Sequence, residues 1–142
     1  MNTSVQVTRS LSASPERVYE AWTNAGLLQR WLAPKAEADA RVGGRFRLEV
    51  DKPEGLHVVT GEYRELSPAR RIVMTWIYEG PMASSGKMEA LLTVDFRVNG
   101  QKTEVSLLHE GLTNPRYLDV IRQGAWNQAL DQLDALLSEE RT

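Results

Sequence analysis

The C-terminal part of the chain shows the clearest helical spacing of hydrophobic residues. Apolar side chains recur there at intervals of three, four and five residues, at Leu118, Ile121, Trp126, Leu130, Leu133 and Leu137. Asn114 is suited to cap a helix and Pro115 to occupy its first position. The pattern predicts one amphipathic helix that runs to Glu140 and is about 36 Å long at a rise of about 1.5 Å per residue. Its apolar stripe requires a partner surface.

The chain before this helix alternates between apolar and polar residues, as strands with one buried face do. Residues 5–11 predict a first strand. Ser14 followed by Pro15 predicts the start of a short helix, and residues 27–32 predict a second one. About six antiparallel strands follow. This order predicts an α+β fold in which one curved antiparallel sheet wraps around the terminal helix and can leave a cup between the two.

The dipeptide Asn99-Gly100 is the strongest turn signal in the chain. A two-residue loop at this point predicts a hairpin in which apolar residues face one another. The predicted pairs are Val94 with Val105, Leu92 with Leu107 and Ala90 with His109. This pairing directs His109 toward the inner face of the sheet.

Two further turns predict the pairing of the other strands. A three-residue loop that includes Arg45 gives the pairs Val42 with Phe46, Ala40 with Leu48 and Ala38 with Val50. A four-residue loop at 67–70 gives the pairs Tyr63 with Met74 and Gly61 with Trp76, where an indole would cover the glycine. The opposite face of that strand, with Val58, Thr60 and Glu62, remains an alternative inner face.

Composition narrows the class of protein. The chain has 142 residues, no cysteine and a net charge of −2, and it is predicted to be one domain over residues 1–142. This charge attracts neither nucleic acid nor acidic membranes. Neither a signal core nor a membrane-spanning apolar run is visible, so the cytoplasm is the expected location. His57 and His109 are not in a ligand-spaced cluster, so no metal and no cofactor is expected.

Six segments, in this order, resemble a known family. They are Ser14–Thr23, Leu28–Pro34, Val42–Phe46, Arg71–Trp76, His109–Gly111 and Trp126–Leu133. They resemble the START/Bet v 1-like (SRPBCC) superfamily, in a branch similar to the C-terminal domain of the activator of heat-shock-protein-90 ATPase. The resemblance implies a helix-grip fold with a cavity. The chain departs from the family pattern at Ala125, where glycine is frequent, and at Leu32-Ala33.

Aromatic and aliphatic residues are concentrated on the predicted inner face. The predicted walls of a ligand site are Trp31, Phe46, Leu48, Tyr63, Met74, Trp76, Leu92, Val94, Phe96, Leu107, His109, Trp126 and Leu130. Plain core packing is the alternative, because a sequence does not display missing volume. Residues 79–87 are predicted to be the loosest loop, in which Met82 can close over an opening, and a simple surface hairpin is the alternative.

Two polar residues are predicted to point inward. His109 is a candidate general acid or base, and its alternative role is that of a hydrogen-bonded core histidine. Arg9 shares the parity of the apolar residues in the first strand, so it requires a carboxylate partner, a ligand anion or a bulge. Glu110 and Glu20 are the candidate partners.

Three functions remain open at this point. The leading one is binding of a small hydrophobic or amphipathic molecule, with His109 as the polar anchor. The second is a protein-interaction module that acts on a chaperone ATPase, which the family resemblance implies. The third is a cyclase, dehydratase or hydrolase that uses His109 on an aromatic or polyketide-like substrate. The resemblance also leaves a homodimer open.

Overall fold

The computed structural model describes residues 3–83 and 87–139. Within them, one antiparallel sheet has seven strands in the spatial order β1-β7-β6-β5-β4-β3-β2. The elements are β1 (Val5–Leu11), α1 (Pro15–Thr23), α2 (Ala25–Trp31), β2 (Lys35–Ala38), β3 (Arg45–Lys52), β4 (Gly55–Ser67), β5 (Arg71–Glu79), β6 (Lys87–Asn99), β7 (Lys102–Glu110), α3 (Pro115–Arg122) and α4 (Ala125–Glu139). The α+β helix-grip fold predicted from the sequence is confirmed.

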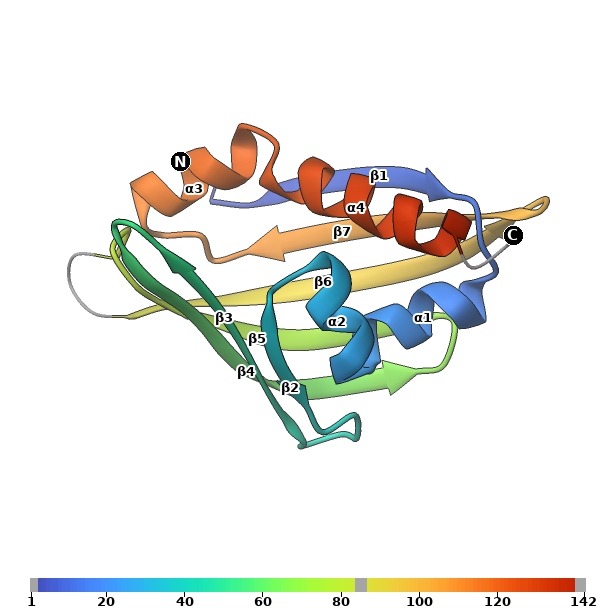
Figure 1. Ribbon diagram of the computed structural model, residues 1–142, viewed down its shortest axis with the longest axis horizontal. Helices are drawn as coiled ribbons and strands as arrows, with labels where there is room; N and C mark the ends of the chain where they lie inside the picture. The colour runs from blue at the N-terminus through green and yellow to red at the C-terminus, as the bar shows by residue number, and fades with distance from the viewer. Residues whose placement is uncertain (1–2, 84–86, 140–142) are drawn as a thin grey trace.

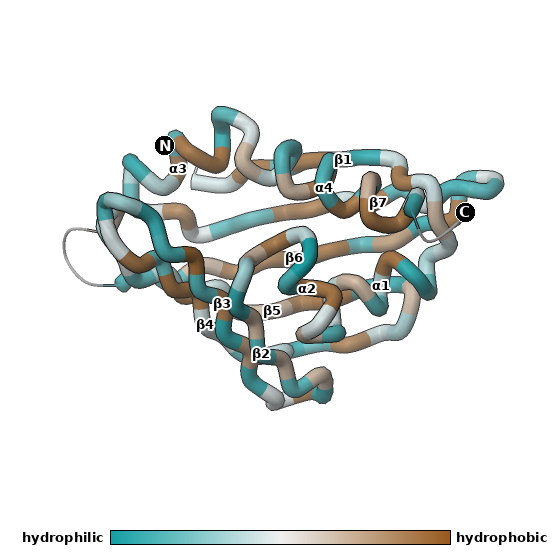
Figure 2. The backbone as a smooth tube through the Cα atoms, viewed as in Figure 1, coloured by the Kyte–Doolittle hydropathy of each residue, from teal (hydrophilic) through white to brown (hydrophobic). Residues whose placement is uncertain are grey.

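The helices gather over one face of the curved sheet (Figure 1). Helix α4 contacts α1, α2 and β1, so the segments nearest the two ends of the chain pack together. Hydropathy changes in short stretches along the strands and along α4, as expected for elements with one buried face (Figure 2). None of the helices in the described residues is long and apolar enough to span a membrane.

Two predicted helix starts have the expected caps. The side chain of Ser14 accepts a hydrogen bond from the backbone of Arg17, and Pro15 occupies the first turn. Asn114 caps α3 in the same way, with Pro115 in its first turn. Each cap satisfies an N–H group that has no partner within the helix.

The prediction of one continuous terminal helix is wrong. The chain forms two helices, α3 and α4, which are separated at Gln123 and Gly124. Gly124 has a φ of +111°, a conformation that side chains with a Cβ rarely adopt. The five-residue interval between Ile121 and Trp126 marks the same point, since three- and four-residue intervals are what keep a stripe on one helix face. The break lets α3 leave the line of α4.

The register predicted for the β6–β7 hairpin is also wrong. Asn99 pairs with Lys102, so the two loop residues are Gly100 and Gln101. Gly100 has a φ of +64°, and glycine with positive φ at the first loop position is the requirement of a type II′ turn. The resulting inner pairs are Leu92 with His109, Val94 with Leu107 and Phe96 with Val105. A shift of two residues keeps every side chain on its face, so His109 is buried as predicted.

The register predicted for β2 and β3 is wrong for a different reason. The observed pairs are Ala38 with Phe46 and Ala36 with Leu48, and the connection spans residues 39–44. Within it, the Asp39 N–H donates to the Arg45 carbonyl, and a Cβ on Gly44 would collide with the Asp39 carbonyl. The chain thus folds back on itself, and Val42 is exposed instead of pairing with Phe46.

The pairing of Tyr63 with Met74 is confirmed, and Tyr63 is buried on the inner face as preferred over its alternative. The turn is shorter than predicted, because Ser67 pairs with Arg71 and the register shifts between Tyr63 and Glu65. The side chain nearest to Gly61 is the ring of Phe46 from β3, its direct partner, rather than the Trp76 indole that was predicted to cover it.

Arg9 forms an ion pair, but its partner is Asp131 and not Glu110 or Glu20 as predicted. Its Nη2 atom lies 2.7 Å from Oδ1 of Asp131 on α4, and its Nη1 atom donates to the Asn127 carbonyl over 3.3 Å. The Ser12 N–H donates to Asp134 on the same helix. The bonds of Arg9 fasten β1 to α4, so of the predicted alternatives the structure shows the ion pair with a carboxylate.

We expect Gly61→Ala to lower the free energy of unfolding by about 1–3 kcal/mol, the usual cost of overpacking. A Cβ at this position collides with the Thr75 carbonyl and lies 2.6 Å from Cε1 of Phe46. Denaturant unfolding measures the change. Gly26→Ala in α2 is the control, because its Cβ meets a single side-chain atom, Oδ1 of the helix cap Asn24, at 3.2 Å, and it should change stability by less than about 1 kcal/mol. Equal effects of the two changes would contradict this account of Gly61.

Candidate ligand-binding cavity

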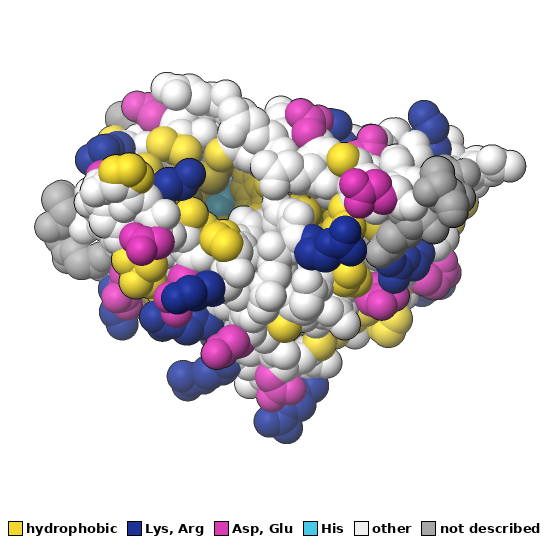
Figure 3. Space-filling view, in the orientation of Figure 1, with side chains coloured by type: hydrophobic (Ala, Val, Ile, Leu, Met, Phe, Trp, Pro, Cys, Tyr) yellow, Lys and Arg dark blue, Asp and Glu magenta, His cyan; other side chains and the backbone are white. Residues whose placement is uncertain are grey.

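A cavity of about 510 Å³ lies between the inner face of β3–β5 and the helices α3 and α4. Its walls are mainly apolar, and its polar side chains are few. The apolar and aromatic lining residues are Leu32, Ala33, Leu48, Val50, Val59, Trp76, Tyr78, Met82, Tyr117, Val120, Ile121, Ala125, Trp126 and Ala129. Figure 3 shows a hollow with a yellow apolar lining, a cyan histidine at depth and dark blue cations beside its mouth.

The structure brings three of the predicted wall residues, Leu48, Trp76 and Trp126, to this cavity. The other ten predicted residues do not line it and instead form the solid core. They are Trp31, Phe46, Tyr63, Met74, Leu92, Val94, Phe96, Leu107, His109 and Leu130, all of them buried. Most of the aromatic crowding on the inner face is therefore core packing.

Side chains of helices α1, α2 and α4 fill part of the cup that the sequence analysis predicted between the sheet and the terminal helix. The Trp22 ring lies 4.9 Å from that of Trp31 and 5.7 Å from that of Trp126. The Trp31 indole donates to the Ala21 carbonyl over 2.9 Å, which ties α2 to α1. The filled half of the cup ends at Trp126, and the cavity begins on its other side.

His109 is a core histidine and does not line the cavity. The Trp126 Nε1–H donates to His109 Nδ1 over 3.1 Å. Because indole is only a donor, Nδ1 carries no proton and the neutral ring is protonated at Nε2. Burial lowers the pKa of His109 to about 3. The side chain is 0% exposed, and so the residue predicted to be the acid/base or polar anchor is a neutral ring that holds Trp126 in place.

The histidine that lines the cavity is His57, which the sequence reasoning did not select. Its Nδ1 atom lies 2.7 Å from the Tyr78 hydroxyl, and its Nε2 atom lies 2.9 Å from Oε2 of Glu54. An ionised carboxylate only accepts, so Nε2 of the neutral ring bears the proton and the Tyr78 hydroxyl donates to Nδ1. The parity of His57 with Tyr63 in the same strand was the signal that could have identified it.

The hydrogen bond from His57 is the largest cause that lowers the pKa of the Glu54 carboxyl. Burial raises the pKa of the Tyr78 hydroxyl, which also accepts a hydrogen bond from the Met82 N–H over 3.2 Å. Carboxylate, imidazole and phenol thus form one chain beside the cavity. Such a chain can pass a proton along its length, with the imidazolium stabilised by Glu54.

Helix α3 supplies lining residues that the prediction of a single helix had not placed. The Tyr117 hydroxyl accepts a hydrogen bond from the Trp76 indole over 2.9 Å, and its ring centre lies 4.5 Å from that of Tyr78. Burial raises the pKa of Tyr117, which keeps its hydroxyl neutral. Met82 lines the cavity, as the loop prediction suggested, while residues 84–86 of that loop lie outside the described residues.

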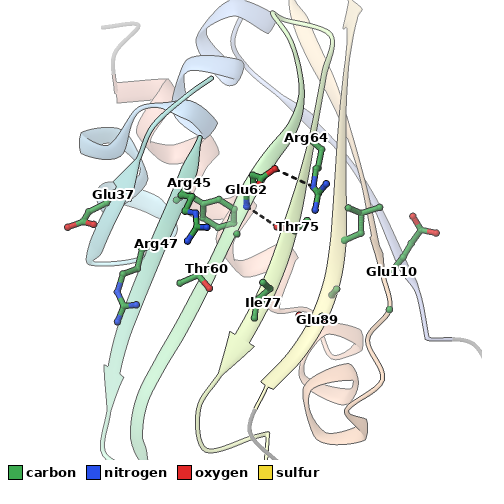
Figure 4. Close-up of a pocket in the computed structure, with 15 residues that line it drawn as sticks. Glu37, Arg45, Arg47, Thr60, Glu62, Arg64, Thr75, Ile77, Glu89 and Glu110 are labelled. Atoms are coloured by element: carbon green, nitrogen blue, oxygen red, sulfur yellow. Dashed lines mark hydrogen bonds and ion pairs between the residues drawn. The ribbon is translucent and has the colours of Figure 1, made fainter. Parts of the chain in front are cut away.

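The outer face of the sheet carries a second, larger hollow of about 820 Å³ with a different character. Its lining is mostly charged or hydroxylated: Glu37, Arg45, Arg47, Thr60, Glu62, Arg64, Thr75, Glu89 and Glu110 (Figure 4). Cations and carboxylates alternate, as in Arg64, which lies 3.8 Å from Glu62. No group of metal-ligating side chains occurs in residues 3–83 and 87–139.

Comparison with known proteins gives consistent results. The family model described as "Activator of Hsp90 ATPase homolog 1-like protein" matches residues 12–138. The human "Activator of 90 kDa heat shock protein ATPase homolog 1" is 30% identical over 106 residues, which are 72% of this chain. The chain spans only 28% of the length of that relative.

Two solved bacterial structures match almost throughout. Protein CV1439 from Chromobacterium violaceum is 31% identical, has a TM-score of 0.78, and the match covers 94% of this chain and 96% of that one. Protein MLL2253 from Mesorhizobium loti has a TM-score of 0.82 at 23% identity, with 96% and 97% of the two chains covered. The second likeness concerns the fold alone.

Acidification is expected to destabilise the protein through His109. An unfolded chain takes up this proton near the ordinary pKa of 6.5, whereas the folded protein does so only near 3. The contribution of the neutral His109 ring to the free energy of unfolding is complete above pH 6.5, the pKa in the unfolded chain. It is lost as the pH falls from there toward the pKa of about 3 in the folded protein, by up to about 1.4 kcal/mol per pH unit.

His109→Gln should remove this part of the pH dependence from the free energy of unfolding, measured with denaturant at several pH values. His57→Gln is the matched control, because it removes the other histidine, at the cavity, and leaves the buried ring in place. A wild-type slope in His109→Gln would contradict the buried, neutral state of His109.

Proposed function

This chain belongs to the family of activator of Hsp90 ATPase homolog 1-like proteins in the START/Bet v 1-like superfamily, and on that basis we propose that it binds a small hydrophobic or amphipathic molecule in its inner cavity. The observation that carries the proposal is the volume of about 510 Å³ left open between the terminal helices and the sheet. Sites for small molecules have volumes of about 300–1,000 Å³.

The chemistry of the lining supports the same role. Apolar side chains come from the sheet on one side, such as Trp76, and from α3 and α4 on the other, such as Ile121 and Trp126. The Trp76 indole N–H is already bound to the Tyr117 hydroxyl, and that of Trp126 is bound to His109. These aromatic rings therefore present apolar surface to a ligand and do not require hydrogen bonds from it.

An enzymatic role is the first alternative, and a specific arrangement of side chains favours it. It rests on the chain from Glu54 through His57 to Tyr78, and no longer on His109. A cyclase, dehydratase or hydrolase reaction on an aromatic substrate would use His57 as the base and Glu54 as its orienting group. In that case His57→Gln would abolish turnover while leaving ligand affinity in place.

A chaperone partner is the second alternative, favoured by the name of the human relative and by the outer hollow. That hollow is broad and charged, with Arg45 and Arg47 on one strand and Glu89 and Glu110 on others, which suits a polar protein surface better than an apolar small molecule. Under this alternative, the protein would raise the ATPase rate of the heat-shock-protein-90 homologue of its own cell. An unchanged rate at saturating protein would dispose of it.

We expect Ala129→Phe to block the cavity. Ala129 lines it from α4, and a phenyl ring at this position would occupy volume needed by a ligand. The fluorescence of the neutral apolar probe N-phenyl-1-naphthylamine, titrated with protein, gives the dissociation constant. The variant should raise that constant at least about tenfold, which corresponds to about 1.4 kcal/mol.

Ala135→Phe is the matched control, since Ala135 is exposed on the same helix and does not line the cavity. This variant should bind the probe as the wild type does. Circular dichroism confirms that both variants fold. Absence of probe binding to the wild type, or equal binding by the two variants, would contradict the proposed function.

A further inference from the structure

The cavity has charge at one end only. Lys52 at the end of β3, Glu54 in the turn that follows and Arg116 in the first turn of α3 are its three ionic lining residues. All three are exposed, whereas the aromatic residues Trp76 and Trp126 that line the same cavity are buried. Figure 3 shows cationic side chains beside the mouth of the hollow. The polar end is therefore the mouth, and the apolar end is the interior.

The negative charge at this mouth, that of Glu54, is held by a hydrogen bond, and together with Lys52 and Arg116 it leaves the mouth a net charge of +1. The Glu54 carboxylate accepts the hydrogen bond from His57 over 2.9 Å, and this bond is the main cause that lowers its pKa. Lys52 contributes a smaller coulombic effect in the same direction. Glu54 is thus held as the partner of the His57 ring, at the side of the mouth.

The positive charges are not engaged to the same degree. Neither Lys52 nor Arg116 has a carboxylate within ion-pair distance in the described part of the chain. Arg116 Nη1 makes one long hydrogen bond, 3.5 Å, to the Pro81 carbonyl. A guanidinium has five N–H donors in a fork that matches the oxygens of a carboxylate, phosphate or sulfonate. Most of this donor capacity remains available to a ligand.

We propose that the ligand is an amphipathic organic anion, whose acidic group lies between Lys52 and Arg116 at the mouth and whose apolar body extends toward Trp76, Ile121 and Trp126. This inference rests on the proposed function and adds the charge and orientation of the molecule bound. An apolar amine of the same length would place its ammonium group against two cations, so the mouth selects by the sign of charge.

Displacement of N-phenyl-1-naphthylamine from the wild-type protein tests this selection. Decanoate and decylammonium have the same chain and opposite charges, and 1-decanol is the neutral member of the series. At low ionic strength we expect decanoate to displace the probe at a concentration about threefold to tenfold lower than decylammonium does. The reason is that Lys52 and Arg116 attract the carboxylate of decanoate and repel the ammonium group of decylammonium. The preference should shrink as salt is added.

Lys52→Gln and Arg116→Gln should each reduce the preference for decanoate over decylammonium by about twofold to fivefold, a ratio taken within each variant so that a change in probe affinity cancels. Retained probe binding also shows that each variant is folded. Lys102→Gln is the matched control, because Lys102 is exposed at the far turn of β6–β7 and does not line the cavity.

The outcomes separate the two proposals. No binding of the neutral probe by the wild type would overturn the cavity function itself. Probe binding without a preference for decanoate, or a preference that survives both glutamine substitutions, would overturn the anionic ligand and leave the cavity function standing. A preference that is lost in the two variants and kept in Lys102→Gln supports the inference.

Discussion

The position of the Trp126 indole determines which part of the inner face is solid and which part is hollow. Its N–H is bound to His109, and its ring lies 5.7 Å from Trp22 on one side and 5.4 Å from Trp76 on another. A donor fixed by one acceptor and confined by two indoles has little rotational freedom. The core of α1, α2 and α4 lies on one side of this ring, and the cavity lies on the other. His109 thus contributes to the site indirectly, by positioning its wall.

The cavity also requires a break between α3 and α4, and Gly124 provides it. If the helix had continued in one direction, its stripe would have covered the sheet along a single line. The break instead allows α3 to bring Tyr117, Ile121 and Arg116 to the end of the cup that α4 leaves uncovered. One backbone conformation, available at low cost to glycine, therefore adds both an aromatic wall and a cation to the site.

The sequence predicted which face each strand buries better than it predicted which residues pair. Leu92 and His109 are both buried although each was assigned a different partner, because an error of two residues leaves the alternation intact. Ala38 and Phe46 were likewise assigned to the inner face with wrong partners. Turn conformation decides the register, and it depends on local bonds such as that from Asp39 to Arg45 that a hydrophobic pattern does not encode.

The candidate site was predicted less well than the fold. Hydrophobicity identifies Tyr63 and Trp76 equally as inner residues, yet only Trp76 borders empty space. Volume depends on how helices fill the cup, and this follows from the break at Gly124 and the packing of Trp22. His57 was overlooked because it is polar and lies in a strand whose inner face was uncertain, although its parity with Tyr63 was visible.

The pairing of β1 with β7 has a consequence for biosynthesis. Val5 pairs with His109, so the strand made first has its neighbour among the last strands to be made, and Arg9 waits even longer for Asp131 on the terminal helix. During synthesis β1 therefore has no strand partner until β7 has been made. Such non-local closure is slow and exposes aggregation-prone surface. The sheet therefore closes only after β7 has been made, and the link from β1 to α4 forms only after Asp131 has followed.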